Sequence, residues 1–321
     1  TTGKPKGVVH SYRAMAWGVT SATRRVRMDI HDRYISYLPL AHVAERMLIE
    51  QASLRYGGQV FFAEALDTFV QDLQRARPTI FFSVPRLWVK FQHGVHTKMP
   101  AKKLHFLMGL PVIGSIVKRK ILAGLGLDQC RIAAGGAAPM PPDVLQWYRT
   151  LGLDLIEVYG MTENCGVSHS TLPGSRGVGT VGQPYEWVES RIDPDNGEIQ
   201  MRCGALMQGY YREDAATAAA ITPDGWLRTG DKGRIDAQGQ LSITGRVKDI
   251  FKTAKGKYVA PAPIEDLLVL HPDIEACAVS GANLAQPLAL VMLSAEAAER
   301  TQDTQARAAL QASLLAHLEQ V

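Results

Sequence analysis

Residues 130–139 read CRIAAGGAAP, and residues 153–163 read LDLIEVYGMTE. Each stretch begins with a short apolar run typical of a buried strand and passes directly into a loop of small or polar residues. A loop at the carboxyl end of a strand commonly lines a ligand crevice in an α/β sheet. The two stretches therefore predict strands that each carry a loop to a binding site.

Further strand-like runs lie at residues 34–40 (YISYLPL) and 79–84 (TIFFSV), and helical patterns lie at residues 67–76 and 142–150. Strands that alternate with helices predict a layered α/β core with a largely parallel sheet. Residues 177–245 instead hold short strands joined by Gly, Pro and Asn-Gly turns. This region predicts a small antiparallel β module.

A new alternation follows the charged string RVKD at residues 246–249. It predicts a helix around Pro263–Leu270, strands at Ile274–Ser280 and Leu288–Ser294, and a helix from Thr304 with Leu310, Leu314 and Leu318 on one face. We therefore expect a second, smaller α+β domain that begins near Lys248.

The composition is that of a globular protein able to bury a core: 46% of the 321 residues are hydrophobic and 21% are charged. The formal net charge of +4 is too small to indicate nucleic-acid binding. The four cysteines are widely spaced, which indicates reduced thiols of a cytoplasmic protein rather than a zinc site or a disulfide framework. No apolar run reaches the roughly 18 residues of a membrane-spanning helix.

The first seven residues, TTGKPKG, combine two hydroxyls, two lysines and two glycines. Such a loop suits phosphate, because glycines expose backbone N–H groups while hydroxyls and lysines add donors and positive charge. The spacing differs from that of a Walker loop. A solvated basic turn has the same composition, so the assignment depends on the motifs that follow.

The loop YGMTE at residues 159–163 holds three kinds of nucleotide-binding group. Tyr159 can stack on a planar base, Thr162 can reach a phosphate, and Glu163 can hold Mg²⁺, a hard cation that prefers oxygen ligands. The small residues of GGAAP leave a flat slot, although close packing of a turn also explains them.

Three later strings add polar groups: GWLRTGD at residues 225–231, GRVKD at 245–249 and KGKYVAP at 255–261. The carboxylate of Asp231 suits the vicinal hydroxyls of a ribose, and Arg246 suits ribose or phosphate oxygens. A turn at Gly256 lets backbone lie beside a narrow ligand. A plain turn or salt bridge explains each string alone, but their occurrence in this order favours a nucleotide site.

The chain resembles the adenylate-forming (AMP-binding) enzyme superfamily, and most closely its long-chain fatty acyl-CoA synthetase branch, in the ordered strings TTGKPKG, YLPLAHV, GGAAP, YGMTE, GWLRTGD, GRVKDIFKTAKGKYVAP and PIE. The resemblance implies a large adenylation domain with a β module over residues 1–247 and a small mobile α+β domain over residues 248–321, both incomplete. It implies ATP, Mg²⁺ and CoA as cofactors and co-substrates. It also implies a long-chain fatty acid, and no nucleic acid, as partner.

Carried over residue by residue, the resemblance implies catalytic roles for Lys4, Lys6, Thr162 and Glu163, with Glu163 as the Mg²⁺ ligand. The implied cofactor-binding set comprises Thr1, Thr2 and Gly3 of the phosphate loop, Gly136, Ala137 and Ala138 of the adenine slot, Tyr159, Gly160 and Met161 of the base-stacking loop, the ribose contacts Asp231 and Arg246, the hinge residue Lys248, and Gly256 at the pantetheine turn. His42 corresponds to a substrate position near the acyl pocket, with a satisfied core histidine as the alternative.

The implied reaction has two steps. A fatty-acid carboxylate attacks the α-phosphorus of ATP to give acyl-AMP and pyrophosphate, and the CoA thiolate then attacks the acyl carbonyl and releases AMP. The protein supplies alignment and charge stabilisation, so no Ser-His-Asp triad is needed. Two alternatives stay open: a nucleotide-binding remnant without catalysis, and an adenylating enzyme that passes the acyl group to a carrier protein or to oxygen.

Two departures from the family pattern bear on activity. The family's phosphate loop normally begins before the position of Thr1. Its small domain normally carries a lysine near the C-terminus, whereas the basic residues after Pro287 are Arg300, Arg307 and His317. We therefore expect an internal fragment of a longer enzyme that is inactive by itself.

Residues 102–120, KKLHFLMGLPVIGSIVKRK, are apolar with basic ends. A core helix and loop whose basic side chains reach solvent explains this pattern. A second hypothesis is peripheral contact with the cytoplasmic face of a membrane, because cations flank a patch of Phe, Leu, Ile and Val.

Overall fold

The computed structural model describes residues 5–175 and 179–319, and the following account concerns these residues. The chain divides into two compact units, each described by itself. The first unit comprises Thr1–Asp193, Ile199–Thr229 and Ile235–Ser242, and the second comprises Pro194–Glu198, Gly230–Arg234 and Ile243–Val321.

The centre of the first unit is a five-stranded sheet with the strand order β4-β5-β6-β7-β8. Strands β4, β5 and β6 are parallel, and β7 and β8 continue the sheet in antiparallel fashion. A second parallel pair joins β2 to β3. The bounds are β2 Arg33–Ser36, β3 Gln59–Phe62, β4 Ile80–Ser83, β5 Ile132–Gly136, β6 Leu155–Tyr159, β7 His169–Ser170 and β8 Gln183–Pro184. The predicted α/β class with a largely parallel core is confirmed.

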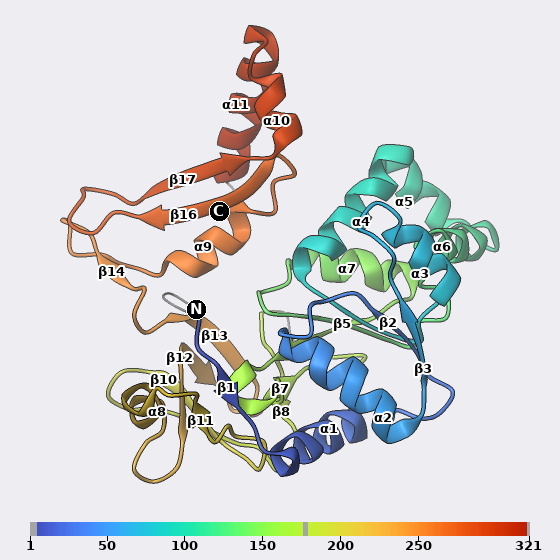
Figure 1. Ribbon diagram of the computed structural model, residues 1–321. Coiled ribbons are helices and arrows are strands. Elements are labelled where there is room, and N and C mark those ends of the chain that lie inside the picture. Colours follow the sequence, from blue (N-terminus) through green and yellow to red (C-terminus); the bar gives the residue numbers. More distant parts are fainter. Residues whose placement is uncertain (1–4, 176–178, 320–321) are drawn as a thin grey trace. The chain divides into compact units, whose positions relative to one another are not determined.

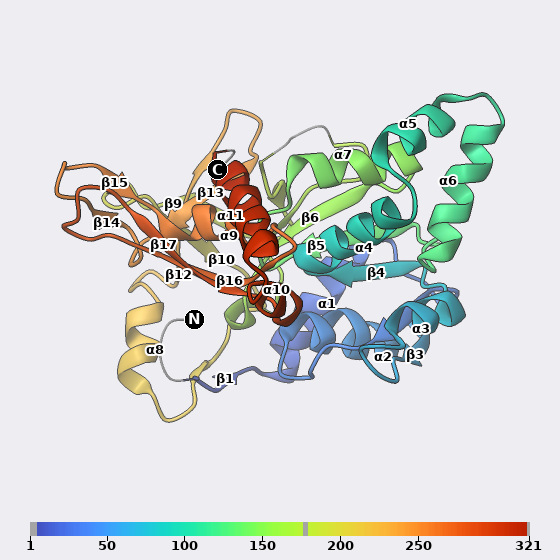
Figure 2. The ribbon, with the colours of Figure 1, turned by 90° about the horizontal axis from the view of Figure 1, so that it is seen from above.

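Helices cover both faces of the five-stranded sheet, as Figures 1 and 2 show. Helices α4 and α7 pack on one face, and α1, the π-helix η1 and α2 pack on the other. The strands are apolar on both sides, as parallel strands covered twice must be. Alternate residues divide between the two faces: Phe81, Ala133 and Leu155 face α4 and α7, and Ile80, Ile132 and Ile156 face α1 and η1.

The helices of the first unit follow the predicted pattern with small shifts of their ends. Helix α1 begins after the N-cap Ser11, whose hydroxyl accepts a hydrogen bond from the Ala14 N–H. The run predicted as a strand from residue 34 to 40 already ends at Ser36, because Pro39 lies in a turn closed by the His42 N–H. The bounds are α1 Tyr12–Val26, η1 Glu45–Gln51, α2 Ala52–Tyr56, α3 Phe69–Ala76, α4 Pro85–Lys98, α5 Ala101–Gly109, α6 Ile113–Gly124, α7 Pro142–Leu151, the 3₁₀ turn η2 Thr162–Asn164 and α8 Asp214–Ala220.

The predicted antiparallel β module is a four-stranded sheet with the order β13-β12-β10-β9. Strands β9 and β10 pair antiparallel on either side of the Asn-Gly turn, with Ile192 opposite Ile199. A separate two-residue ladder joins β1 to β11. The bounds are β1 Val8–Val9, β9 Glu189–Ile192, β10 Glu198–Arg202, β11 Gly209–Tyr210, β12 Leu227–Ile235 and β13 Leu241–Arg246.

The C-terminal part of the second unit is an α+β arrangement, as predicted. Helix α9 packs on the antiparallel pair β16–β17 around Leu268, Ile274 and Val279. Of the three leucines expected on one face of the last helix, Leu310 is buried and Leu314 packs against this cluster, but Leu318 at the helix end is 50% exposed. The bounds are β14 Phe251–Lys252, β15 Tyr258–Val259, α9 Pro261–Leu268, β16 Ile274–Ser280, β17 Leu288–Leu293, α10 Ala295–Arg300 and α11 Thr304–Leu318.

An ion pair between the buried Asp32 and the partly exposed Arg131 ties together the beginnings of three strands in the first unit. Asp32, just before β2, accepts hydrogen bonds from Arg131 Nη2 at 2.6 Å and Nε at 3.0 Å, and from the Thr79 hydroxyl at 2.6 Å. Arg131 also donates to the carbonyls of Val26 and Arg27 at the end of α1. Burial alone would raise the pKa of Asp32, but the hydrogen bonds from Arg131, Thr79 and the Asp29 N–H outweigh it and hold this pKa below its usual value.

We predict that Asp32→Asn lowers the free energy of unfolding by about 1–2 kcal/mol at neutral pH, because the buried carboxylate loses its charged hydrogen bonds while the 39% exposed Arg131 side chain can be hydrated. The carboxylate stabilises the fold above the unfolded-state pKa of about 4, and this contribution disappears as pH falls through the lower folded-state pKa. The difference between wild type and variant should therefore shrink below about pH 4. Urea unfolding at neutral and acidic pH measures it, with the exposed Asp67→Asn as control; a gap that does not change with pH would contradict the assignment.

Candidate functional site

The two loops singled out from the sequence leave neighbouring parallel strands at the same edge of the sheet. Gly136, the last residue of β5, lies opposite Val158 of β6 in the strand register. A Cβ atom on Gly136 would lie 2.8 Å from the Val158 carbonyl oxygen, so only glycine fits there. The carboxyl ends of β5 and β6 thus bring GGAAP and YGMTE together, as expected for a ligand crevice in an α/β sheet.

The residues predicted for the adenine slot are small, and two of the three are solvent-accessible while Gly136 is buried. Ala137 has a φ of 70°, a conformation that residues other than glycine rarely adopt, and both Ala137 and Ala138 are exposed. Tyr159 ends β6 and is only 8% exposed, with its ring centroid 6.3 Å from that of His169. The slot therefore has an open alanine floor and a tyrosine packed into the sheet edge.

The YGMTE loop closes on itself and turns its polar side chains outward. A Cβ atom on Gly160 would lie 2.3 Å from the Gly166 backbone, which makes glycine obligatory. The Gly166 N–H donates to the Met161 carbonyl at 2.8 Å, and the Asn164 side chain accepts from the Met161 N–H at 3.0 Å. Thr162 is exposed and Glu163 is half-buried on the resulting turn.

A contact chain connects the opening loop to Glu163. Strand β1 pairs with β11, which puts Val8 opposite Tyr210. The Lys6 ammonium lies 4.6 Å from the centroid of the Tyr210 ring, and the Tyr210 hydroxyl donates to Glu163 Oε1 at 2.7 Å. Burial and the neighbouring Glu163 raise the pKa of Tyr210, which keeps this hydroxyl protonated as a donor. The structure therefore brings two separately predicted residues, Lys6 and Glu163, to one place.

Tyr210 and His10 are site residues that the sequence patterns did not reveal. His10 Nε2 lies 2.7 Å from the Thr162 carbonyl oxygen, and its Nδ1 lies 3.5 Å from Cys165 Sγ. The available signal was position in the sequence: His10 lies three residues after Gly7 of the lysine-glycine segment, and Tyr210 belongs to the Gly-Tyr-Tyr string at residues 209–211.

Glu157 is a buried carboxyl group on β6 beneath the two loops. It is 8% exposed, and its Oε1 accepts a long hydrogen bond from the Met140 N–H at 3.4 Å. Burial raises the pKa of Glu157 to about 7, partly offset by the Met140 hydrogen bond. This side chain therefore changes charge near neutral pH directly under the loop that holds GGAAP.

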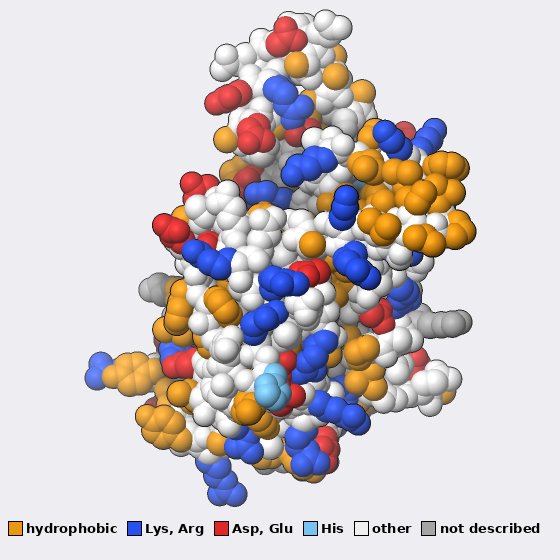
Figure 3. Space-filling model, turned by 90° about the vertical axis from the view of Figure 1, so that its right-hand side faces the viewer, with side chains coloured by type: hydrophobic (Ala, Val, Ile, Leu, Met, Phe, Trp, Pro, Cys, Tyr) orange, Lys and Arg blue, Asp and Glu red, His pale blue; other side chains and the backbone are white. Residues whose placement is uncertain are grey.

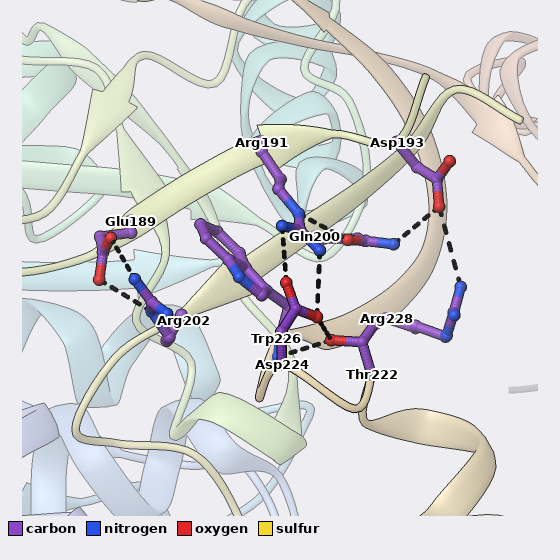
Figure 4. Close-up of polar contacts among 9 residues, drawn as sticks. All are labelled: Glu189, Arg191, Asp193, Gln200, Arg202, Thr222, Asp224, Trp226 and Arg228. Atoms are coloured by element: carbon purple, nitrogen blue, oxygen red, sulfur yellow. Dashed lines mark hydrogen bonds and ion pairs between the residues drawn. The ribbon is translucent and has the colours of Figure 1, made fainter. Parts of the chain in front are cut away.

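The β module holds the GWLRTGD string through a clamp on its tryptophan, shown in Figure 4. The guanidinium groups of Arg191 and Arg202 lie 4.3 Å and 4.8 Å from the Trp226 ring centroid. Each arginine is itself held by a carboxylate: Arg191 contacts Asp224 at 2.9 Å, and Arg202 contacts Glu189 at 2.8 Å. The two guanidinium groups hold the Trp226 ring in place by cation–π contacts. Because Trp226 directly precedes β12, they also fix the start of this strand.

The predicted ribose contacts form an ion pair in the second unit. Arg246 Nε, at the end of β13, lies 3.0 Å from Asp231 Oδ1 on β12, and Asp231 is 7% exposed. Gly230 just before it has a φ of 73°, and its N–H donates to Glu198 Oε1 at 2.9 Å. This glycine conformation within a strand sets the direction of the following carboxylate.

His42, Lys248 and Gly256 are the remaining predicted residues that the structure describes. His42 is half-buried in the turn before η1, where its Nδ1 accepts from the Ala44 N–H at 3.2 Å. Lys248 is exposed just after β13, and Gly256 has a φ of 81° in the turn between β14 and β15. Thr1, Thr2, Gly3 and Lys4 lie outside the described residues.

The donor set around Glu163 fits Mg²⁺ bound together with phosphates. Across residues 5–175 and 179–319, no group of three or more metal-binding side chains occurs. Mg²⁺ is commonly held by one or two carboxylates plus substrate phosphates, so a single oriented carboxylate is sufficient. The Tyr210 hydroxyl occupies Oε1 of Glu163.

A parallel sheet with glycine-bearing loops at its carboxyl edge, and a lysine linked through Tyr210 to a carboxylate, is the arrangement of a nucleotide-binding α/β protein. Residues 1–211 match the family described as AMP-binding enzyme, and residues 248–319 match the AMP-binding enzyme C-terminal domain. The chain belongs to the AMP-binding enzyme family, which confirms the resemblance found in its motifs.

Named relatives are fatty-acid–CoA ligases. The long-chain-fatty-acid–CoA ligase ACSBG2 of Xenopus laevis is 32% identical over 302 residues, which cover 83% of this chain and 41% of the relative. The long-chain-fatty-acid–CoA ligase FadD15 of Mycobacterium bovis is 34% identical over 334 residues, covering 93% of this chain and 54% of the relative. The chain thus spans about two fifths to one half of the length of these curated relatives.

The fold is shared with the O-succinylbenzoate CoA synthetase MenE of Bacillus subtilis in complex with AMP. This structure has a TM-score of 0.72 and 24% identity, and the match covers 91% of this chain and 57% of that chain. A complex of the same enzyme with ATP and a magnesium ion has a TM-score of 0.71.

We predict that Glu157→Gln becomes more stable relative to wild type as pH rises from about 5 to 8. The folded-state pKa of about 7 lies above the unfolded-state value of about 4.3, so wild type loses up to about 3 kcal/mol of stability across this interval. The amide carries no charge and removes this loss. Urea unfolding over the pH range measures the effect, with the exposed Glu64→Gln as control; parallel curves for Glu157→Gln and wild type would contradict a raised pKa.

Proposed function

We propose that the protein activates a long-chain fatty acid with ATP to acyl-AMP and transfers the acyl group to CoA, giving acyl-CoA, AMP and pyrophosphate. The observation that most directly supports the proposal is the contact chain from Lys6 through Tyr210 to Glu163. It joins a lysine-glycine segment to an oriented carboxylate at the carboxyl edge of a parallel sheet. The fatty-acid class is taken from the names of the relatives at about 30% identity.

In the proposed first step a fatty-acid carboxylate oxygen attacks the α-phosphorus of ATP, and the bond to the β-phosphate oxygen breaks. Lys6 would hold the phosphates that leave as pyrophosphate, and the exposed Thr162 hydroxyl would donate to an α-phosphate oxygen. Mg²⁺ bound by Glu163 and the phosphates would neutralise the charge that develops on pyrophosphate. Thr1, Thr2, Gly3 and Lys4 are proposed, from the motif alone, to complete the phosphate loop.

The alanine floor formed by Ala137 and Ala138 is proposed to receive the flat adenine. Tyr159, Gly160 and Met161 would form the wall against its other side. Asp231 would accept hydrogen bonds from the ribose hydroxyls, oriented by the Arg246 ion pair.

In the proposed second step the CoA thiolate attacks the acyl carbonyl and AMP leaves. Lys248 is proposed as the hinge of the small domain over residues 248–321, and Gly256 as the turn beside pantetheine. The exposed position of Lys248, two residues after the end of β13, is compatible with a hinge.

A largely apolar recess beside the His42 turn is proposed as part of the acyl site. It lies between β2, η1 and β4, and its lining includes Tyr37, Leu48 and Phe82 together with the buried Glu45, whose carboxylate accepts a hydrogen bond from the Leu38 N–H at 3.2 Å. Its volume of about 10 Å³ is no larger than a water molecule requires, so an acyl chain would have to displace side chains to enter. The π-helix η1 is a helix form found often at functional sites.

The deciding experiment is fatty-acid-dependent ATP–pyrophosphate exchange by the protein translated from its complete reading frame. Exchange that requires a long-chain acid, followed by acyl-CoA formation when CoA is added, supports the proposal. ATP binding without exchange would instead indicate a non-catalytic nucleotide-binding protein. Exchange without CoA acylation would indicate transfer to a carrier protein or another acceptor.

We predict that Tyr210→Phe lowers exchange about tenfold at limiting Mg²⁺ and that raising Mg²⁺ restores much of it, because the variant loses the hydrogen bond that orients Glu163. The neighbouring Tyr211→Phe is the matched control, since the Tyr211 side chain is 60% exposed. Exchange rates measured against Mg²⁺ concentration test this. Equal Mg²⁺ curves for the two variants would remove Tyr210 from the proposed site.

We predict that Asp231→Ala raises the KM for ATP at least about tenfold, because a lost charged hydrogen-bond acceptor weakens ribose binding. The exposed Asp67→Ala serves as control. Steady-state exchange at varied ATP concentration gives both constants. An unaltered KM would withdraw the ribose assignment.

A further inference from the structure

The segment from Leu73 to Leu127 is strongly basic without any acidic residue. Ten of the chain's 35 Lys and Arg residues and none of its 31 Asp and Glu residues fall within it. Near the N-terminal end of the segment, Arg75 pairs with Asp72, which lies just before the segment, and Arg77 pairs with Asp128, which lies just after it. The interior of the segment therefore presents positive charge that no acid within it balances.

Five of these cations lie on helices α5 and α6: Lys102, Lys103, Lys118, Arg119 and Lys120. Within the part of the chain that the structure describes, none of the five forms an ion pair. Four are exposed and Lys118 is half-buried. Their charges are available to an external partner.

The two helices are held to the core by a different set of side chains. Leu104 of α5 is 1% exposed, and Val117 and Ile121 of α6 pack against the same cluster that contains Trp88. Gly114 packs so closely that a Cβ atom there would lie 2.3 Å from the Met108 carbonyl oxygen. The α5–α6 hairpin is thus firmly seated.

The outward side of the hairpin is apolar. Phe106 is 67% exposed, Val112 75%, Ile113 47% and Ile116 50%. Val112 has a φ of 62°, a conformation that β-branched residues rarely adopt, at the turn between the helices. Figure 3 shows hydrophobic side chains gathered at its upper right with Lys and Arg side chains beside them.

We propose that this hairpin face, defined by Phe106, Val112, Ile113, Ile116 and the five cations, docks on the surface of an anionic lipid bilayer. Large apolar side chains beside lysines and arginines match the boundary between acyl chains and acidic headgroups, where apolar groups insert and cations remain at the headgroups. Among the described residues no helix has the length and apolarity needed to cross a bilayer, so the proposed contact is superficial.

A second copy of the chain is the less suitable occupant of this face. A two-fold interface would bring the same five cations of both copies together, and like charges repel. An acidic protein would satisfy the charges, and the test below separates it from lipid. The proposal does not depend on the proposed catalytic activity.

The test is sedimentation with vesicles of phosphatidylglycerol and phosphatidylcholine, compared with pure phosphatidylcholine vesicles, at near-physiological salt. We expect binding to the anionic vesicles only, and at least about tenfold weaker binding after the patch cations are changed to glutamine. The patch variant is K102Q/K103Q/K118Q/R119Q/K120Q. A second variant, F106S/I113S/I116S, keeps every charge and should also bind more weakly, particularly at high salt where electrostatic attraction is screened.

The matched control removes five exposed arginines elsewhere and therefore changes the net charge equally: R13Q/R27Q/R55Q/R212Q/R307Q. It should retain binding to anionic vesicles. Circular dichroism and thermal unfolding verify that each variant folds. If the patch variant and the control lose binding equally, net charge alone explains the binding and the proposal is overturned. Failure of the wild-type protein to bind anionic vesicles would also overturn it.

Discussion

The ion pair of the buried Asp32 with the partly exposed Arg131 fixes the framework on which the first unit depends. It joins the end of α1 to the beginnings of β2, β4 and β5 through one carboxylate and one guanidinium. Removing a carboxylate from water is costly, and here several hydrogen bonds to the same group offset that cost. Because the pair holds the starts of the strands in register, it also determines where their carboxyl ends lie, and the GGAAP and YGMTE loops leave from those ends.

At the carboxyl ends of the strands, close packing of the backbone rather than an ion pair fixes the structure. Gly136 and Gly160 each lie against backbone that leaves no room for a Cβ atom. The loops they introduce are consequently rigid where they leave the sheet, while Thr162 and Glu163 remain accessible on the turn. Preorganised donors and charges need this combination, because a site that must rearrange during reaction loses much of its electrostatic advantage.

Local patterns were sufficient to predict the parallel strands, the helices between them and the loops at their ends. A short apolar run followed by small residues encodes both a strand and its exit within about ten residues. Tyr210 and His10 escaped prediction because their roles arise from the β1–β11 pairing, which joins Val8 to Tyr210 across most of the first unit. Likewise, the sequence allowed α5–α6 to be core or surface; only packing distinguishes Leu104, which is buried, from Phe106, which is exposed.

The α5–α6 hairpin shows why anchoring and exposure must be considered separately. Leu104, Val117 and Ile121 already secure it to the core. Polar residues at positions 106, 113 and 116 would leave those anchors unchanged and would avoid exposing apolar surface to water. Stability of the fold therefore accounts for the apolar side chains that face the core. It does not account for the exposed apolar side chains at positions 106, 113 and 116, nor for the absence of acidic residues between Leu73 and Leu127. An exposed apolar patch bordered by unbalanced cations is explained instead by a partner that supplies both negative charge and an apolar environment.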